Sequence, residues 1–465
     1  MSAQSQHEAR AAIRPVKERV EDDLIARPGV VAVDIAEKVS QGEPTGELSI
    51  VVFVEEKKPE DALRDADVIP QEIDGVKTDV QELKIVLQHA VRYAEVTAQV
   101  DTGAYTTITG GIGIGPARTV FLSPPDVPSP GNYVFVGTLG AIVEDRTTHA
   151  RMALTNFHVG AVNNTWSVGD VMVQPSRVDG GPATGHFGTL TRAVLTENTD
   201  GSVITIDTGR ASGISVEGIG AVAGQGVASV GMAVQKRGRT TEHTFGSVVS
   251  TDFTLSVDYG SDVGPHTLRH QIRIDTDTTQ STRFSDHGDS GSVVMDMSRN
   301  VVGLLFAGSD DGVMTFANPI QVALDELGVN LLTDAGTLFT HAGTTCKFVT
   351  NQVLCDLISV TTICHQFTHT AICNQITKPK LCLVTQPVTC NLQTASAVCQ
   401  ITKACPTTIT CGPGGFDPSQ PVQLPGGERD LGSQYGDADD AVQGVFVAGY
   451  LAALEAVETV SKSEG

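Results

Sequence analysis

The chain has 465 residues, which is too long for one ordinary domain and predicts about two or three. Its formal net charge of −23 comes from 31 basic against 54 acidic residues, so phosphate backbones and anionic lipids repel it. Nucleic acid is therefore not an expected partner. Since no run of about 20 apolar residues is present, we expect neither a membrane span nor a membrane partner.

The N-terminus and the distribution of cysteine favour a cytoplasmic location. The first residues, MSAQSQHEAR, lack the basic segment followed by an apolar segment that marks a secretory signal. Residues 1–345 contain no cysteine, so this part of the chain has no disulfides.

Residues 1–95 are predicted to form a small α+β domain. Apolar side chains recur at roughly helical spacing over residues 7–26, and Pro28-Gly29 ends that pattern. The other expected elements of this domain are strands over 30–39, 47–56 and 76–83 and a short helix near 59–65.

Residues 100–332 contain many short β-like runs separated by turn residues, a pattern typical of antiparallel sandwiches and barrels. Strands are expected at 137–144, 152–159, 202–209, 246–253, 272–275, 292–295 and 301–308, with a short helix over 318–329. The sequence GGIGIG (110–115) is similar to a phosphate-binding fingerprint. It does not join a strand to a helix in a βαβ unit, so we interpret it as a turn or bulge.

All nine cysteines fall within residues 343–411, mostly nine residues apart, and form an internal repeat. This spacing is not a multiple of the helical turn, and the Thr, Val and Ile content favours strands. Four interpretations stay open: a flat stack of short β units with a cysteine ladder, disulfide pairing, metal binding, or a segment that is cleaved or modified as a substrate in cis. The odd number of cysteines counts against disulfides, and the lack of tight CxxC pairs counts against a metal. The ligand types closest together are Cys364, His365, His369 and Cys373.

Two further segments follow the repeat. Residues 412–436 are a linker rich in Gly and Pro, and residues 437–465 show one apolar face of an amphipathic helix. Gly444 and Gly449 weaken this helix, so we expect it to dock on another surface. The repeat or the helix is the expected contact in a homo-oligomer.

The strongest chemical signal is the sequence HGDSGS at 287–292. A serine nucleophile needs a shaped turn and amide donors for an oxyanion, and the flanking glycines let the backbone turn in that way. We predict Ser290 as the nucleophile, the amides of Gly288 and Ser290 as the oxyanion donors, and Asp289 as a buried residue that holds the turn.

A serine nucleophile also needs a base, and that base needs an acid to orient it. His158 lies near the end of the apolar run LTNFHV, whereas His287 lies in the oxyanion turn and points poorly for a base. Asp207 lies in the apolar run ITIDT, where a carboxylate is costly without a partner such as an imidazole N–H. We predict His158 as the base and Asp207 as its acid. The rival carboxylates lie in turns that contain Gly or Asn, where acids are unremarkable: Asp170, Asp179 and Asp200.

The order His158, Asp207, Ser290 is that of chymotrypsin-type enzymes and differs from the subtilisin and α/β-hydrolase orders. Residues 100–330 resemble the trypsin-like serine peptidases, in particular a bacterial group related to the plant narrow-leaf type. The matching pieces are GTLGAIV, LTNFHV, GDVMVQPS, ITIDTG, KRGRTT, GDSGSVV and VGLLFAG. Residues 1–95 also look like the domain that often precedes such peptidases. The resemblance implies a mainly β protein with a chymotrypsin-like double β-barrel, peptide-bond hydrolysis through an acyl-enzyme, and neither a metal nor another cofactor.

Two positions depart from the family pattern. Ser292 stands where the family has a glycine, and a small residue is expected to be tolerated there. Phe284 stands where the resemblance places the base of the specificity pocket, a position that is acidic in tryptic enzymes. Cleavage after Lys or Arg is therefore not expected, and a small or apolar residue is preferred. The expected pocket wall consists of Phe306, Ala307 and Gly308.

Three hypotheses cover the whole protein. The first is an endopeptidase that acts on protein or peptide substrates, with the repeat in a regulatory, assembly or cis-substrate role. The second is a non-enzymatic assembly or scaffold protein that retains a peptidase fold. The third is a peptidase that matures itself by releasing the cysteine-rich segment. A complete triad favours an enzyme, because a barrel used only for binding has no need of all three residues.

Overall fold

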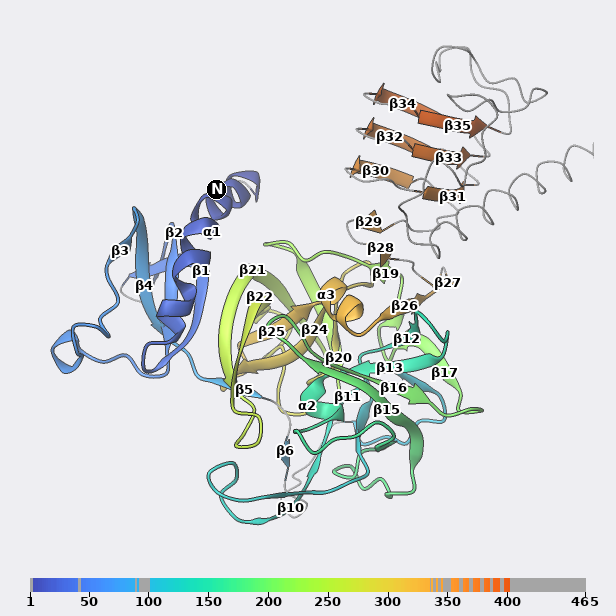
Figure 1. The fold of residues 1–465 in the computed structure, drawn as a ribbon, viewed down its shortest axis with the longest axis horizontal. Coiled ribbons are helices and arrows are strands. Elements are labelled where there is room, and N and C mark those ends of the chain that lie inside the picture. The colour runs from blue at the N-terminus through green and yellow to red at the C-terminus, as the bar shows by residue number, and fades with distance from the viewer. Residues whose placement is uncertain are drawn as a thin grey trace, which may run out of the picture. The chain divides into compact units, whose positions relative to one another are not determined.

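The computed structural model describes residues 3–40, 43–87, 90–91 and 101–334, followed by short strands between residues 336 and 401. The chain is mainly β and divides into two compact units, Met1–Val349 and Thr350–Gly465 (Figure 1). Within the described residues, no helix is both long and apolar enough to cross a membrane.

The first barrel lies in a nine-stranded sheet with the order β11-β8-β14-β15-β16-β13-β12-β26-β27. Only Leu139 and Gly140 separate β11 from β12, so the pairing of β11 with β8 closes the barrel. Alternate apolar side chains of these strands, among them Ile142, Phe187 and Ile204, fill the interior. The strands are β8 (Gly113–Pro116), β11 (Gly137–Thr138), β12 (Ala141–Asp145), β13 (Arg151–Thr155), β14 (Val171–Val173), β15 (His186–Leu195), β16 (Asp200–Ile206), β26 (Val329–Thr333) and β27 (Gly336–Thr337).

The second barrel is built from β20, β23, β24, β25, β22 and β21 in that order, and a pairing of β20 with β21 closes it. Val234, Val248, Ile274 and Leu305 belong to its buried interior. The expectation of a double β-barrel is thus confirmed. The strands are β20 (Ala233–Gly238), β21 (Glu242–Asp258), β22 (Pro265–Thr276), β23 (Val293–Asp296), β24 (Asn300–Ser309) and β25 (Met314–Pro319).

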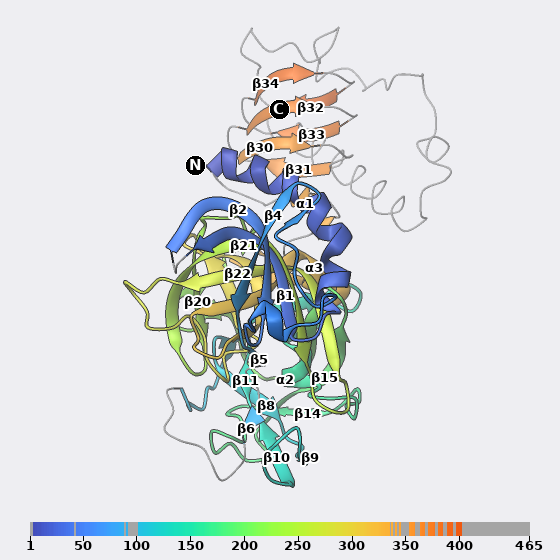
Figure 2. The ribbon, with the colours of Figure 1, turned by 90° about the vertical axis from the view of Figure 1, so that its left-hand side faces the viewer.

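The N-terminal region packs a helix on a small sheet, and that sheet continues the sheet of the second barrel (Figure 2). Strand β1 pairs with β21, with Ala32 opposite Leu255 and Val33 opposite Thr254. The helix adds an ion pair between Arg14 and Asp252 at 2.5 Å. The elements are α1 (Ala3–Ile25), β1 (Val30–Ser40), β2 (Glu43–Val54), η1 (Glu60–Ala62), β3 (Glu72–Ile73) and β4 (Val76–Glu82).

Short elements connect these parts. They are β5 (Ile85–Leu87), β6 (Ala90–Val91), β7 (Ile108–Gly110), β9 (Val120–Leu122), β10 (Gly131–Phe135), α2 (Phe157–Gly160), β17 (Ser212–Val216), β18 (Gly220–Ala221), β19 (Gly224–Gln225), α3 (Ile320–Glu326), β28 (Thr340–His341) and β29 (Thr344–Thr345).

Two expected elements differ from the structure, and a third agrees with it in part. The run 152–159 is not one strand, because β13 ends at Thr155 and His158 lies on the helical turn α2. The helix expected over 318–329 ends at Glu326, where the chain turns back as β26. GGIGIG does turn at Gly111, whose φ is +84°, and then continues as the buried strand β8.

The second unit contains parallel strands with the cysteines in register. Cys355, Cys373 and Cys390 are opposite one another in the sheet β30-β32-β34. Cys364, Cys382 and Cys399 have the same relation in β31-β33-β35. These pairings agree with the interpretation of stacked β units. The strands are β30 (Val353–Ile358), β31 (Ile363–Phe367), β32 (Ala371–Ile376), β33 (Lys380–Val384), β34 (Val388–Gln393) and β35 (Ala397–Ile401). The expected linker 412–436 and helix 437–465 lie outside the described residues.

Candidate active site

Ser290 lies in the turn that leads into β23, and its side chain is fully buried. The amides of Asp289, Gly291 and Ser292 donate to backbone carbonyl oxygens at 2.9 to 3.0 Å. The two amides interleaved with them, those of Gly288 and Ser290, donate to no carbonyl oxygen among the described residues. The turn therefore leaves the two predicted oxyanion donors available.

The left-handed backbone at Gly288 explains why the turn needs glycine there. Its φ is +97°, a conformation that L residues with a side chain rarely adopt. A Cβ at this position would lie 2.5 Å from Thr240 Oγ1. Any other residue would therefore move the backbone that carries the amide.

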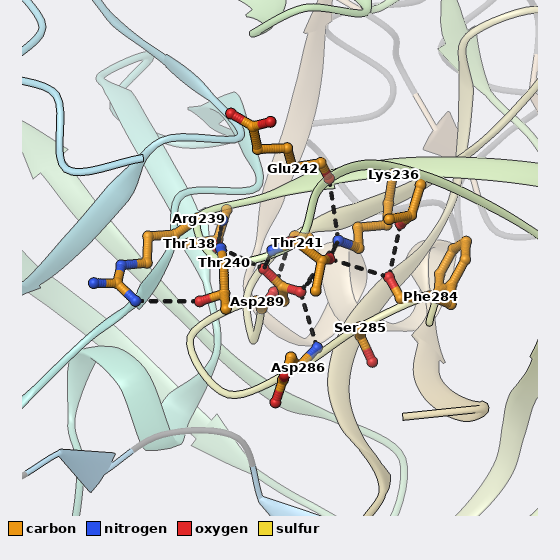
Figure 3. Close-up of polar contacts among 12 residues, drawn as sticks. Thr138, Lys236, Arg239, Thr240, Thr241, Glu242, Phe284, Ser285, Asp286 and Asp289 are labelled. Atoms are coloured by element: carbon orange, nitrogen blue, oxygen red, sulfur yellow. Dashed lines mark hydrogen bonds and ion pairs between the residues drawn. The ribbon is translucent and has the colours of Figure 1, made fainter. Parts of the chain in front are cut away.

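The buried carboxylate of Asp289 stabilises this turn, as the sequence predicts. This carboxylate accepts hydrogen bonds from the amides of Thr240 (2.8 Å) and Asp286 (2.9 Å) and from Thr241 Oγ1 (2.6 Å; Figure 3). Lys236 Nζ lies 3.2 Å from the same carboxylate, and both side chains are fully buried. Burial lowers the pKa of Lys236, an effect that the charge of Asp289 opposes. The pair ties β20 to the nucleophile turn.

His158 is joined to Asp200 and not to Asp207. Its Nδ1 lies 2.5 Å from Asp200 Oδ2, and its backbone amide donates to Asp200 Oδ1 at 3.3 Å. A carboxylate oxygen can only accept here, so Nδ1 carries the proton and Nε2 is the nitrogen able to take one up. Both side chains are buried.

The prediction that Asp207 orients His158 is wrong, and the register of two strands gives the reason. Strands β13 and β16 are antiparallel, with Thr155 opposite Ser202, so the start of β16 lies beside the residues that lead to His158. Asp207 follows the far end of β16, five residues after Ser202, or roughly 17 Å along the strand. There its carboxylate pairs with His186, and both side chains are about one third exposed.

Tyr259 completes the surroundings of Asp200 and was missed by the sequence analysis. Its hydroxyl donates to Asp200 Oδ2 at 2.8 Å, the same oxygen that faces His158. Burial raises the pKa of Tyr259 well above its usual range, and the Asp200 charge raises it further. The phenol therefore stays a donor. Since Tyr259 follows β21, the second barrel helps to hold a pair that belongs to the first.

Gly137 lies between the segment that carries His158 and the segment that carries Ser290. A Cβ on this residue would lie 2.4 Å from Val159 Cγ2 and 2.9 Å from the carbonyl oxygen of Ser290. Thr138 N donates to that same carbonyl oxygen at 2.7 Å. The residue next to His158 and the backbone of Ser290 thus lie against the same glycine. The Ser290 hydroxyl itself donates to Phe306 O at 3.1 Å.

The predicted pocket residues lie on two cores. Phe284 is fully buried inside the second barrel, with its ring centroid 6.0 Å from Lys236 Nζ. The side chains of Phe306 and Ala307 pack in a cluster that includes Phe53 of the N-terminal sheet. Gly308 continues the same strand, β24. Among the described residues no group of His, Cys, Asp and Glu side chains is arranged to hold a metal ion.

Comparisons with known proteins gave matches among solved structures only. No family model and no curated protein matches the chain. Solved structures similar to it include a glutamic acid specific serine protease (20% identity, 48% of this chain and 100% of the other, TM-score 0.35). Thermobifida fusca Protease A (21%, 49% and 99%, TM-score 0.34) and a Cellulomonas bogoriensis chymotrypsin (20%, 49% and 99%, TM-score 0.33) are further examples.

Proposed function

We propose that the chain is a serine endopeptidase with Ser290 as nucleophile, His158 as base and Asp200 as the residue that orients the base. The observation that carries this proposal is the buried 2.5 Å contact between His158 Nδ1 and Asp200, beside a serine in a turn with two available amides. Burying a carboxylate and an imidazole costs desolvation free energy, whereas apolar side chains of similar size would fill the same space without that cost. A catalytic role gives a reason for the buried pair.

The chemistry follows from these positions. The Ser290 hydroxyl turns from Phe306 O towards His158 Nε2, which accepts its proton as Oγ bonds to the substrate carbonyl carbon. The amides of Gly288 and Ser290 stabilise the oxyanion. His158 then gives the proton to the leaving amine nitrogen as the C–N bond breaks. Water, deprotonated by His158, then attacks the ester carbon. The C–Oγ bond breaks as His158 returns the proton to Ser290 Oγ, which releases the acid product.

We infer a substrate preference from Phe284, Phe306 and Ala307. All three side chains are apolar and fully buried. Phe284 lies inside the second barrel and Phe306 and Ala307 lie in a separate cluster, so none of them brings a carboxylate that would offset the desolvation of a basic substrate residue. Small or apolar residues before the scissile bond are therefore the preferred ones. A panel of peptides that differ only at this residue tests the preference, and fastest cleavage after Lys or Arg would contradict it.

The test of the proposed activity is hydrolysis of a denatured protein by the wild type, Ser290→Ala and Ser292→Ala. Ser292 is a matched control, because it is a buried serine of the same turn whose hydroxyl donates to Asp289 O at 2.6 Å. We expect Ser290→Ala to lose a factor on the order of 10⁶ in turnover and Ser292→Ala to keep most of it. Equal rates in all three chains would refute the proposal.

For residues 343–411 we propose a stack of strands whose cysteines are reduced. The in-register positions of the cysteines in two parallel sheets support stacking. A thiol titration of the unfolded, unreduced chain should then find nine free thiols. A count near one would indicate disulfides. Comparing the native mass of the full chain with that of a chain ending at residue 342 tests an assembly role.

A further inference from the structure

Strand β24 changes partners at the point where it passes the nucleophile. On one edge it pairs with β25 from Gly303 to Gly308. On the other edge it pairs with β23 as far as Leu304, and the Ser290 hydroxyl then bonds to Phe306 O. Beyond Phe306, this second edge is the place where an extended peptide could be added to the sheet beside Ser290.

That edge is already filled by another part of the same chain. Strand β5 pairs antiparallel with β24, with Leu87 opposite Ala307, Val86 opposite Gly308 and Ile85 opposite Ser309. Because the pairing is antiparallel, the chain approaches Phe306 as it runs from Ile85 to Leu87. In Figure 1, β5 lies where the chain passes from the N-terminal domain to the barrels.

A second strand of the same segment lies on the other side of the nucleophile. In β6, Ala90 is opposite Phe135 and Val91 is opposite Val134 in β10. Phe135 is only two residues from Gly137, which packs against the carbonyl oxygen of Ser290. Two short strands, of which one ends at Leu87 and the next begins at Ala90, thus pair with the two strands, β24 and β10, that lead to the surroundings of Ser290.

We propose that this chain occupies its own substrate site: Ile85–Leu87 and Ala90–Val91 pair with the strands on either side of Ser290 as an extended substrate would. The segment is therefore a built-in competitor, and a peptide substrate binds only after displacing it. The inference rests on the proposed function only in naming Ser290 as the nucleophile. Both Ser290 and His158 are buried in the full chain, at 0% and 1% exposure, as an occupied site requires.

The pairing identifies which residue of β5 to change. The amide of Asp310 donates to Lys84 O at 3.0 Å. Hydrogen-bonded and non-bonded pairs alternate along an antiparallel ladder, so Val86 and Gly308 form the next bonded pair, while Ile85 and Leu87 do not. Val86→Pro therefore removes an amide that the ladder uses, and Ile85→Pro, a matched control, removes one that it does not.

The experiment measures binding in a Ser290→Ala background, so that no turnover is needed. The probe is a fluorescent peptide with the sequence LKIVLQHAV, residues 83–91 of this chain. We expect Val86→Pro to lower its Kd roughly tenfold and Ile85→Pro to leave the Kd within about threefold. Leu87→Asp is a second variant, because it places a charge in the apolar cluster that Leu87 shares with Phe306 and Ala307, and so expels β5 while keeping every amide.

The outcomes separate this inference from the proposed activity. An unchanged Kd in both Val86→Pro and Leu87→Asp, with melting temperatures showing that both chains fold, would overturn the inference. If the variants bind the peptide more tightly but the chains that keep Ser290 hydrolyse nothing, the substrate site is occupied as proposed and the proposed peptidase activity is refuted. If the chains that keep Ser290 hydrolyse substrate but the variants bind the peptide no more tightly, only the proposal that β5 and β6 occupy the site is refuted.

Discussion

The pair Asp200→Asn and Asp207→Asn separates the two acids that the sequence offers for His158. Asp200 accepts from His158 Nδ1 at 2.5 Å, from the His158 amide at 3.3 Å and from Tyr259 at 2.8 Å, all in a fully buried position. An amide NH₂ facing Nδ1 would favour the imidazole tautomer with the proton on Nε2, which cannot accept the Ser290 proton. The Asp207 carboxylate pairs with His186, and both side chains are about one third exposed.

The expected magnitudes differ by orders of magnitude. A triad acid changed to its amide lowers kcat on the order of 10⁴-fold, which corresponds to about 5 kcal/mol in the activation free energy. An exposed ion pair contributes about 0 to 1 kcal/mol to stability and lies far from the reacting atoms, so Asp207→Asn should keep its activity within about twofold.

The assay is kcat/KM for one chromogenic peptide at several pH values, with the melting temperature of each variant as the folding control. A loss of less than tenfold in Asp200→Asn would refute the assignment of Asp200. A comparable loss in Asp207→Asn would show that the carboxylate placed beside His158 by the strand register is not the one that orients this histidine.

Three further changes test other parts of the site and of the fold. Tyr259→Phe removes a donor to Asp200 and should lower kcat/KM by about tenfold, measured with the same peptide. Gly288→Ala places a Cβ against Thr240 and should cost about 10² in kcat or more while the melting temperature falls only slightly. Burial alone would raise the pKa of Asp145, but hydrogen bonds from the following turn and an ion pair lower it overall. The pKa of Asp145 is thus lower in the folded chain than in the unfolded chain. The wild type should therefore exceed Asp145→Asn in free energy of unfolding by the full amount above about pH 4, and the difference should shrink as the pH falls. Urea unfolding at several pH values measures it.

The turn at residues 287–292 was predictable because its backbone geometry depends on neighbouring residues. The six residues HGDSGS (287–292) contain Gly288 with its left-handed backbone, the buried Asp289 and the two available amides. The alternating runs between turns likewise predicted the two barrels, since apolar periodicity depends only on neighbouring residues.

The acid was not predictable in the same way, because its identity depends on strand pairing. Asp207 looked costly within the run ITIDT, but β16 ends at Ile206 and Asp207 reaches the surface. Asp200 looked like an ordinary turn residue, yet it opens β16 and is fully buried. A usable signal was present: in an antiparallel pair, the start of the later strand lies beside the end of the earlier one, where His158 is found.

Tyr259 and β5 had no signal in the sequence. Tyr259 reaches Asp200 from the second barrel, 59 residues further along the chain. The residues IVL of β5 look like any short apolar run, and only the completed sheet pairs them with Ala307, Gly308 and Ser309 of β24. Contacts of this kind arise from the packing of whole elements, which local patterns do not encode.

The most direct test of the central claim is covalent labelling of the native chain with a fluorophosphonate, followed by mass mapping of the modified residue. Only an activated serine reacts at an appreciable rate. The predicted result is a single adduct on Ser290, lost in His158→Ala and strongly slowed in Asp200→Asn. An unlabelled wild-type chain, or labelling that His158→Ala leaves unchanged, would contradict the account.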